Sequence, residues 1–279
     1  MEKLLIVDGM NLYFQMYCGM PARIVNKEGK GIQGTLGFVG ALIKIIKITN
    51  PSHVVVLFDC EHENDRAEIL PEYKANRICD PDEQEDDSYV QIFDVYDALT
   101  FMNIKHAEVK DFEADDAVAS YVFRYSSAIE ICILSNDSDF FQLLSNNVKM
   151  IRYRGIKTNI CDTHFLQNKY GILPCQYADF KSLTGDNSDN IKGASNVGPK
   201  TASALINEFG SLQEVIDNAA KIKKPLIRES IIKNTDRLQI NYKLIKLVDR
   251  ASLPYVLGDL AYNYNGITTN EVLKGIGLR

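Results

Sequence analysis

Lys3-Leu-Leu-Ile-Val-Asp8 is a short apolar run that finishes on an aspartate, and two later runs have the same form. They are His53-Val-Val-Val-Leu-Phe-Asp59 and Glu130-Ile-Cys-Ile-Leu-Ser-Asn-Asp137. Short Val/Ile/Leu-rich runs separated by helix-length stretches are typical of buried parallel strands. Because open α/β sheets bind ligands at the carboxyl ends of such strands, we expect the three aspartates to converge on one edge. Crowded carboxylates either protonate or bind cations, so this edge is predicted to hold divalent metal.

The composition is that of an ordinary globular protein. The 279 residues are 46% hydrophobic and 24% charged, and the length suits one large domain or two modest ones. The apolar run at the amino terminus is too short for a secretion signal and leads into the first aspartate, so we expect a cytoplasmic protein without a membrane span. The six cysteines include no Cys-x-x-Cys pair, which favours reduced thiols over disulfides or a zinc site.

The distribution of charge matters more than its sum. A net charge of −6 ordinarily speaks against a nucleic-acid partner. However, Lys and Arg cluster in three segments, at 66–77, 192–200 and 221–224, away from the acidic strand ends. The net charge therefore does not exclude nucleic acid.

The chain divides into an α/β half and a helical half. Strand-like and helix-like runs alternate over residues 1–160, and a polar excursion at about 60–95 includes the acidic run 80–87. From residue 161 helical signals dominate, and the tail 251–279 is expected to pack back on the first half. The expected helices are 35–49, 113–125, 163–170, 176–183, 199–209, 211–219, 226–234 and 236–249.

Further carboxylates stand at a predicted helix start, after the third strand and in one polar loop. The acids in Glu113-Ala-Asp115-Asp116 could cap a helix, and those in Asp186-Asn-Ser-Asp189 could form a turn. Three acids in four residues exceed what a cap needs, so we favour metal ligands. The candidate ligands are Asp8, Asp59, Glu113, Asp115, Asp116, Asp137, Asp139, Asp186 and Asp189.

These acids are too many for one ion. Two divalent ions about 3.5–4 Å apart could use them, and such a pair stabilises the attacking and leaving oxygens of an in-line displacement at phosphorus. Asp116 is the weakest candidate, because neighbouring residues on a helix do not share a face.

Two basic segments could contact a nucleic acid. Lys74 and Arg77 share a helix face and could reach one phosphate, although such a pair could also be a solvated surface. Arg66 and Tyr73 nearby favour binding of single-stranded ends by charge and stacking. The turn at 193–201 could hold phosphate on backbone amides, or be a structural hairpin. Its candidate DNA-binding residues are Asn196, Val197, Gly198, Pro199, Lys200 and Thr201.

Seven motifs occur in an order that matches a known family. They are Val7-Asp8-Gly9, Phe58-Asp59, Pro71-Glu-Tyr-Lys-Ala-Asn-Arg77, Glu113-Ala-Asp-Asp116, Ser135-Asn-Asp-Ser-Asp139, Gly185-Asp-Asn-Ser-Asp-Asn-Ile191 and Gly198-Pro-Lys-Thr-Ala202. The chain resembles the bacterial 5′-3′ exonuclease and flap endonuclease family, which includes the nuclease domain of DNA polymerase I. No polymerase follows residue 279, so we expect either a freestanding nuclease, which we favour, or an excised domain.

The resemblance implies a PIN-like parallel-sheet catalytic domain over 1–160 with a helical arch at about 60–95. It also implies a helix-three-turn-helix DNA-binding region at 161–250, followed by the tail 251–279. Lys74 and Arg77 match the phosphate-steering, catalytic residues of the arch. A first metal would bind Asp8, Asp59, Glu113 and Asp115 with help from Asp137, and a second would bind Asp139, Asp186 and Asp189. A potassium ion would bind the carbonyls of Leu183, Thr184, Lys192, Ala194 and Val197.

The chain departs from the family pattern at three places. Gln15 stands where many relatives carry arginine, which puts a phosphate contact there in doubt. Asn196 replaces a glycine, but asparagine tolerates left-handed backbone, so we expect the turn to survive. The acidic run 80–87 is unusual beside a DNA path and is expected to tune the entry of 5′ ends.

The predicted function is structure-specific 5′ nuclease activity with two Mg²⁺ ions, for which Mn²⁺ is expected to substitute. The expected partners are branched or recessed DNA with 5′ ends, with RNA primers as a further candidate, and the expected state is a monomer. The alternative is a non-catalytic DNA-junction-binding protein. A phosphatase using aspartyl phosphate is disfavoured, because Asp8 is followed by Gly9 and Met10 instead of forming an Asp-x-Asp motif.

Overall fold

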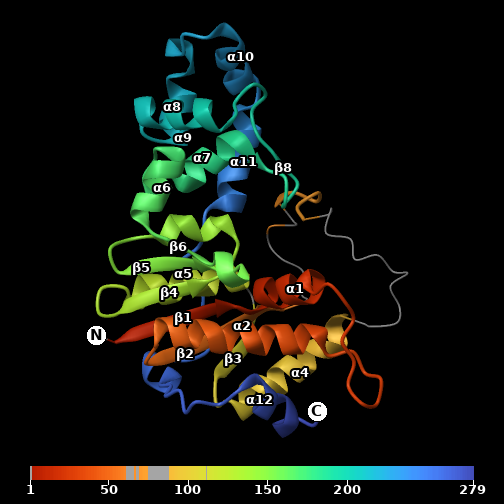
Figure 1. Cartoon of the computed structure of the whole chain (residues 1–279). Coiled ribbons are helices and arrows are strands. Elements are labelled where there is room, and N and C mark those ends of the chain that lie inside the picture. Colours follow the sequence, from red (N-terminus) through yellow and green to blue (C-terminus); the bar gives the residue numbers. More distant parts are fainter. Residues whose placement is uncertain (1, 61–65, 67–68, 75–87, 111) are drawn as a thin grey trace.

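The structure is a computed structural model that describes residues 2–60, 66, 69–74, 88–110 and 112–279 (Figure 1). The predicted arch residue Arg77 and the acidic run 80–87 lie outside the described residues.

A six-stranded sheet forms the base of the molecule, in the order β3-β2-β1-β4-β5-β6. Neighbours among the first five strands are parallel, and β6 is antiparallel to β5. The three apolar runs that end in aspartate form the adjacent strands β2, β1 and β4, so the predicted parallel sheet is confirmed. The strands are β1 (Lys3–Asp8), β2 (His53–Asp59), β3 (Lys105–Val109), β4 (Glu130–Leu134), β5 (Val148–Arg152) and β6 (Asn159–Cys161).

Alternate side chains of the central strands enter two separate hydrophobic cores, because successive residues of a strand point to opposite faces. Leu5 and Val7 pack in a core with helices α1 (Gly9–Gly19), α2 (Gln33–Thr49) and α4 (Ser88–Phe101). Leu4 and Ile6 pack on the other face with α5 (Ala114–Tyr125). Helices on both faces make this the doubly covered arrangement expected of a parallel sheet.

A helical part stands above the sheet in Figure 1. Its helices are α6 (Thr163–Tyr170), α7 (Tyr177–Thr184), α8 (Pro199–Phe209), α9 (Leu212–Asp217), α10 (Pro225–Lys233) and α11 (Thr235–Ile245). A hairpin of β7 (Gly185–Asp186) and β8 (Ile191–Lys192) separates α7 from α8. The short 3-10 helices are η1 (Ser138–Leu143), η2 (Gly155–Lys157), η3 (Pro174–Gln176), η4 (Ala219–Lys221) and η5 (Leu257–Leu260).

One predicted helix end was wrong. We expected the last long helix to reach Asp249, but α11 ends at Ile245. The next backbone amides find other acceptors: Leu247 donates to Gln142 Oε1 at 3.3 Å and Val248 donates to Asp116 Oδ1 at 2.8 Å. These bonds to the sheet part replace the helical hydrogen bonds and draw the chain out of the helix.

The tail returns to the sheet part. The Ala251 amide donates to Ser120 Oγ at 2.8 Å, and the Tyr121 hydroxyl donates to the Tyr255 carbonyl at 2.9 Å. The last helix, α12 (Thr269–Gly275), contacts α2 and α4. No helix in the described parts of the chain is both long and apolar enough to span a bilayer.

Gly9 lets α1 begin directly against β2. A Cβ atom at this position would lie 2.6 Å from Phe58 Cδ1 and 2.8 Å from the Leu57 carbonyl oxygen. A side chain would therefore push the Asp8 end of β1 away from the Asp59 end of β2.

We expect Gly9→Ala to destabilise the protein by about 1–3 kcal/mol, the usual cost of overpacking a tight core. Denaturant unfolding monitored by circular dichroism measures this free energy. Gly40→Ala is the matched control inside α2, where the added Cβ would meet only Thr269 Oγ1 at 3.8 Å. There the gain in helix propensity should leave stability unchanged or raise it by up to about 1 kcal/mol. If the two substitutions changed the free energy of unfolding equally, Gly9 would not be required for the close packing of α1 against β2.

Candidate metal centre

Four carboxylates lie near one another at the carboxyl edge of the sheet, where their charges interact, and we call them the first acid group: Asp8, Asp59, Asp115 and Asp137. Among the described residues, this set is not one whose ligand oxygens all lie within 4.8 Å of one another. Asp8 ends β1, Asp59 ends β2 and Asp137 follows β4, while Asp115 lies in the first turn of α5. The Asp59 Oδ1 atom accepts the Ala114 amide at 2.7 Å, which fixes the start of α5 against the strand ends.

Burial and mutual repulsion raise the pKa of carboxyls in this group. The pKa of Asp8 is raised to about 7, first by burial and then by the neighbouring Asp59 carboxylate. The pKa of Asp115 is raised well above its usual value, by burial and by Asp137, Asp8 and Asp59. A divalent cation would relieve this repulsion, and carboxylate oxygens are the ligands that hard cations prefer. The donor set therefore fits a metal such as Mg²⁺.

Ser135 orients Asp8, a role that the sequence motif alone does not reveal. Its buried hydroxyl donates to Asp8 Oδ2 at 2.7 Å and accepts the Asp137 amide at 3.0 Å. The other oxygen, Asp8 Oδ1, accepts the Asn11 amide at 3.1 Å and so caps α1. Both Asp8 oxygens are thus held in place by neutral donors.

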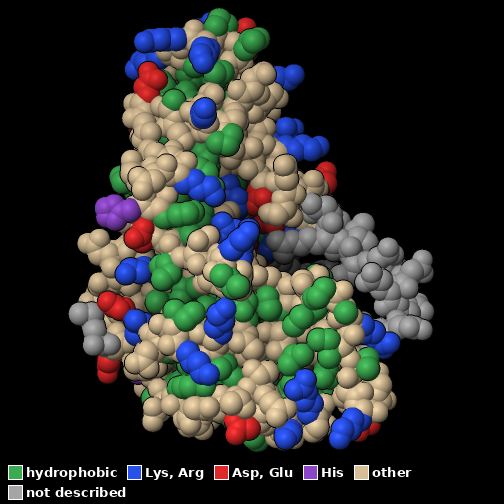
Figure 2. Space-filling view, viewed as in Figure 1, with side chains coloured by type: hydrophobic (Ala, Val, Ile, Leu, Met, Phe, Trp, Pro, Cys, Tyr) green, Lys and Arg blue, Asp and Glu red, His purple; other side chains and the backbone are tan. Residues whose placement is uncertain are grey.

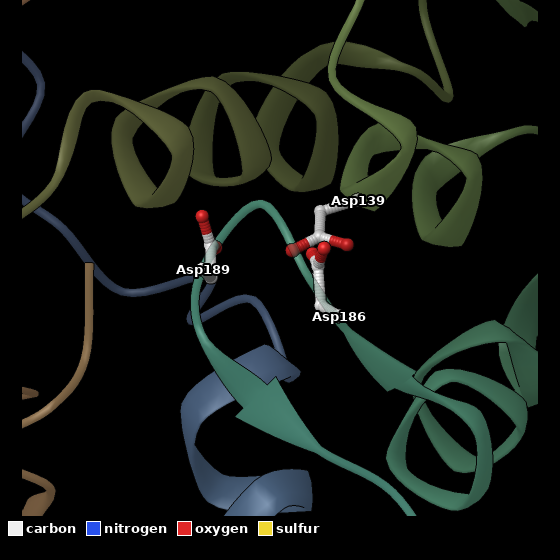
Figure 3. A group of neighbouring side chains, drawn as sticks. All are labelled: Asp139, Asp186 and Asp189. Atoms are coloured by element: carbon white, nitrogen blue, oxygen red, sulfur yellow. The ribbon is translucent and has the colours of Figure 1, made fainter. Parts of the chain in front are cut away.

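Three further carboxylates, Asp139, Asp186 and Asp189, form the second acid group. One oxygen of each lies within 4.8 Å of the others. Figure 3 shows Asp139, from η1, facing Asp186, from β7, while Asp189 extends from the far side of the connecting loop. The pKa of Asp139 is raised to about 7, chiefly by burial, although the Lys181 ammonium opposes this effect.

Lys181 was not among the predicted site residues, yet its side chain lies inside the second acid group. It forms ion pairs with Asp139 and Asp186. Burial disfavours the charged ammonium, but the surrounding carboxylates raise the pKa of Lys181 well above its usual value. Although burial also disfavours the ionised Asp186 carboxylate, Lys181 and Ser188 hold its pKa below the usual value. In the sequence Lys181 looks like an ordinary helical lysine, because only the fold turns it inward.

Glu113 and Asp116 face the base of the predicted arch. Arg66 is buried and bridges the two carboxylates, with Nη2 at 3.0 Å from Asp116 Oδ1. Asp116 also accepts the Val248 amide. Here both residues lie in an internal ion-pair network, and the expected roles of Asp116 as a metal ligand and Arg66 as a DNA contact stay predictions. Glu113, expected to bind the first metal, belongs to this network too.

Lys74 and Tyr73 lie between the two acid groups. The Lys74 ammonium is 2.8 Å from Glu113 Oε1, and the buried Tyr73 hydroxyl is 3.4 Å from the same carboxylate. The Lys74 backbone amide donates to the Asp189 carbonyl at 3.1 Å. Lys74 thus has its side chain beside Glu113 and its backbone beside the second acid group. Tyr73 is buried, and its stacking on a base stays a prediction.

The predicted turn at 193–201 exists, and its residues differ in exposure. Asn196 has φ 63°, the left-handed conformation expected of the asparagine. Gly198 and Pro199 are exposed at the start of α8 and so is Lys200, whereas Val197 packs in the core, so a DNA contact there would use its backbone. Thr201 is half-buried and its amide donates to the Gly198 carbonyl.

Several carbonyls predicted to bind potassium already accept hydrogen bonds. The Leu183 and Ala194 carbonyls accept backbone amides, and the Lys192 carbonyl accepts Asn241 Nδ2 at 2.9 Å. Thr184 and Val197 are the other two members of the predicted set. Asn241 is almost fully buried and also donates to the Ser182 carbonyl, so it ties the hairpin to α7.

Gln15 faces protein groups. Its amide nitrogen donates to the Tyr153 carbonyl, and its amide oxygen accepts Asn136 Nδ2. Because both polar atoms of the Gln15 side chain bond to protein groups, the structure agrees with the doubt that this residue contacts a phosphate.

A parallel sheet that gathers carboxylates at its carboxyl edge and carries a helical part defines a PIN-like α/β protein with a centre suited to divalent ions. Two family models match the chain: the 5′-3′ exonuclease N-terminal resolvase-like domain over residues 3–171 and the 5′-3′ exonuclease C-terminal SAM fold over residues 172–266. The chain belongs to the 5′-3′ exonuclease family. The family and fold class predicted from the motifs are thereby confirmed.

Curated relatives include bacterial DNA polymerases I. The thermostable DNA polymerase I of Thermus aquaticus is 32% identical over 253 residues, which are 90% of this chain and 29% of that protein. DNA polymerase I of Caldicellulosiruptor bescii is 33% identical over 264 residues, which are 92% of this chain and 30% of that protein. The chain thus spans less than a third of the length of these relatives.

Solved structures share the fold. The T5 D15 protein co-crystallised with metal ions superposes with a TM-score of 0.72 at 23% identity, covering 88% of this chain and 89% of that one. The catalytic core of Rad2 in complex with a DNA substrate gives a TM-score of 0.61 at 15% identity, covering 99% of this chain and 92% of that one.

We expect Ser135→Ala to weaken Mn²⁺ binding by about 10–100-fold, the usual cost of losing a group that orients a metal ligand. Isothermal titration calorimetry without DNA measures the affinity. Ser120→Ala is the matched control: Ser120 is equally buried but bonds the Asp116 carbonyl and the tail. Loss of stability with unchanged Mn²⁺ affinity in both variants would contradict the role of Ser135.

Proposed function

We propose that this protein is a structure-specific 5′ nuclease that hydrolyses DNA phosphodiesters with two divalent metal ions. The observation that carries the proposal is the presence of two adjoining acid groups. Asp137 belongs to the first group, Asp139 belongs to the second, and the Asp139 amide donates to Asp137 Oδ1 at 2.9 Å. Two metal ions bound side by side are suited to displacement at phosphorus.

The first acid group would hold one ion and the second acid group the other. When bound, the ions would lower the pKa of the attacking water and neutralise the departing oxygen. We propose Mg²⁺ because every candidate ligand is a carboxylate oxygen, and we expect Mn²⁺ to substitute. Glu113 would contribute to the first site only if its carboxylate turned away from Lys74 and Arg66. Potassium at the hairpin stays part of the proposal.

Basic and backbone groups would position the substrate. Lys74, released from Glu113, would face the scissile phosphate, and we keep Arg77 in this role as part of the proposal. The exposed start of α8 would hold a phosphate of the downstream duplex, because helix amino termini attract anions. On the face in Figure 2, Lys and Arg side chains gather where the helical part meets the sheet part, beside acidic side chains.

The family and its solved members support a DNA substrate. One neighbour at 22% identity is a T5 D15 flap endonuclease in a complex with DNA and metal ions, and the Rad2 core also holds DNA. We therefore propose flaps, nicks and gaps with 5′ ends as substrates, with RNA primers as a further candidate. A monomeric, cytoplasmic enzyme with the domain division 1–160, 161–250 and 251–279 belongs to the same proposal.

We expect Asp115→Asn to reduce cleavage of a 5′-flap DNA by at least about 100-fold, because a direct metal ligand matters more than its supporting groups. The change removes a repelling charge from the first acid group, so the thermal unfolding temperature of the metal-free protein should stay the same or rise. Gel analysis of a flap labelled at its 5′ end, with magnesium or with EDTA, gives the rate and the product size. Near-normal cleavage by the folded variant would refute the proposal. If the wild-type protein bound the flap but did not cleave it with magnesium, the protein would instead be a junction-binding protein.

We expect Lys74→Ala to lower the single-turnover cleavage rate more than the affinity for DNA, because the ammonium acts on one phosphate among many contacts. Fluorescence anisotropy with Ca²⁺ measures affinity, and rapid quench with Mg²⁺ measures the rate. Lys149→Ala removes an equal charge from an exposed position on β5 and serves as the control. Equal losses of rate and affinity would make Lys74 an anchor only.

A further inference from the structure

Lys181 places a positive charge of the protein inside the second acid group. Its side chain is 8% exposed, and its ammonium nitrogen lies 2.5 Å from Asp186 Oδ2 and also pairs with Asp139. These two carboxylates are the ones that face each other in Figure 3. The ammonium thus binds the same pair of carboxylates that a metal ion at this group would use.

The position of Lys181 explains how the second acid group holds together without metal. Asp139 comes from η1 and Asp186 from the hairpin that follows α7, and the two would repel each other across this junction. A buried charge is tolerated only when it is paired. Lys181 satisfies this condition by bridging the two elements, while α7 carries it at a fixed distance from the hairpin.

The same ammonium must also affect metal binding. When all three are ionised, the carboxylates carry three negative charges, and Lys181 offsets one of them. A divalent ion placed among these acids either meets the ammonium at short range or displaces it from Asp139 and Asp186. Both alternatives cost free energy, since like charges repel strongly at such distances in a protein interior. The lysine near the first acid group, Lys74, has its ammonium paired with Glu113 at 2.8 Å, whereas Lys181 pairs directly with two members of the second acid group.

We propose that Lys181 is a built-in counter-cation of the second acid group, which holds Asp139 and Asp186 together in the metal-free protein and makes divalent ions bind there more weakly than at the first acid group. The inference rests on the proposed function, because it takes both groups as metal sites. It assigns Lys181 a positioning role toward the metal ligands, without requiring contact with DNA.

The test measures Mn²⁺ binding without DNA. Electron paramagnetic resonance of free Mn²⁺ gives the number and affinity of bound ions, and thermal unfolding in EDTA or Mn²⁺ gives stability. Wild-type protein should bind one ion tightly and one weakly. Lys181→Met should tighten the weak site by at least about tenfold, lower the unfolding temperature in EDTA and enlarge the rise caused by Mn²⁺.

Two control variants separate charge from shape. Lys181→Arg keeps the positive charge and should keep the weak second site. Lys169→Met removes an exposed lysine from α6 and should change neither affinity. If Lys181→Met is unfolded in EDTA but folds in Mn²⁺, the counter-cation role is supported.

Three results would overturn the inference. They are two equally tight sites in the wild type, a second site in Lys181→Met that is unchanged or weaker, and a second site in Lys181→Arg that is tighter than in the wild type. Each of these results would leave the proposed nuclease function standing. Wild-type protein that binds no Mn²⁺ would instead refute the proposed function and the inference with it.

Discussion

Repulsion between carboxylates at the carboxyl edge of the sheet is the constraint to which the surrounding structure responds. Burial and neighbouring anions raise the pKa of Asp8 to about 7, so the site holds charge at a cost. Neutral donors absorb part of this cost: Ser135 bonds Asp8, and the Ala114 amide bonds Asp59. Buried cations offset the charge of neighbouring carboxylates: Arg66 pairs with Asp116, and Lys181 pairs with Asp139 and Asp186. The remaining charge would favour the binding of divalent ions.

The sheet can carry this charge because its centre is apolar and rigid. The side chains of β1 and β2 are buried on both faces up to the aspartates that end the strands. Two hydrophobic cores hold the strands in register, and Gly9 lets α1 start without separating their ends. The hydrophobic effect thereby pays for a charged edge that would not be stable alone.

The sequence allowed the sheet and the position of the acids to be predicted, because both follow from local patterns. Apolar runs of four or five residues identified β1, β2 and β4, and the carboxylates at their ends identified the edge. The edge strand β3 was not predicted from the sequence, because it is only partly buried and lacks such a run. Lys181 and Arg66 could not be placed either. Whether a lysine or arginine points to solvent or to a buried carboxylate depends on helix packing, which no local pattern encodes.

The segment at 72–74 is fastened to the loop of the second acid group at two points. The Lys74 amide donates to the Asp189 carbonyl, and Asn190 Nδ2 donates to the Glu72 carbonyl at 2.9 Å. Just upstream, Arg66 is locked to Glu113 and Asp116 at the start of α5. A displacement of this segment would pull on the loop of the second acid group and on the ion-pair network of Glu113 and Asp116. The position of residues 72–74 and the shape of this acid-bearing loop are therefore mechanically coupled through the backbone.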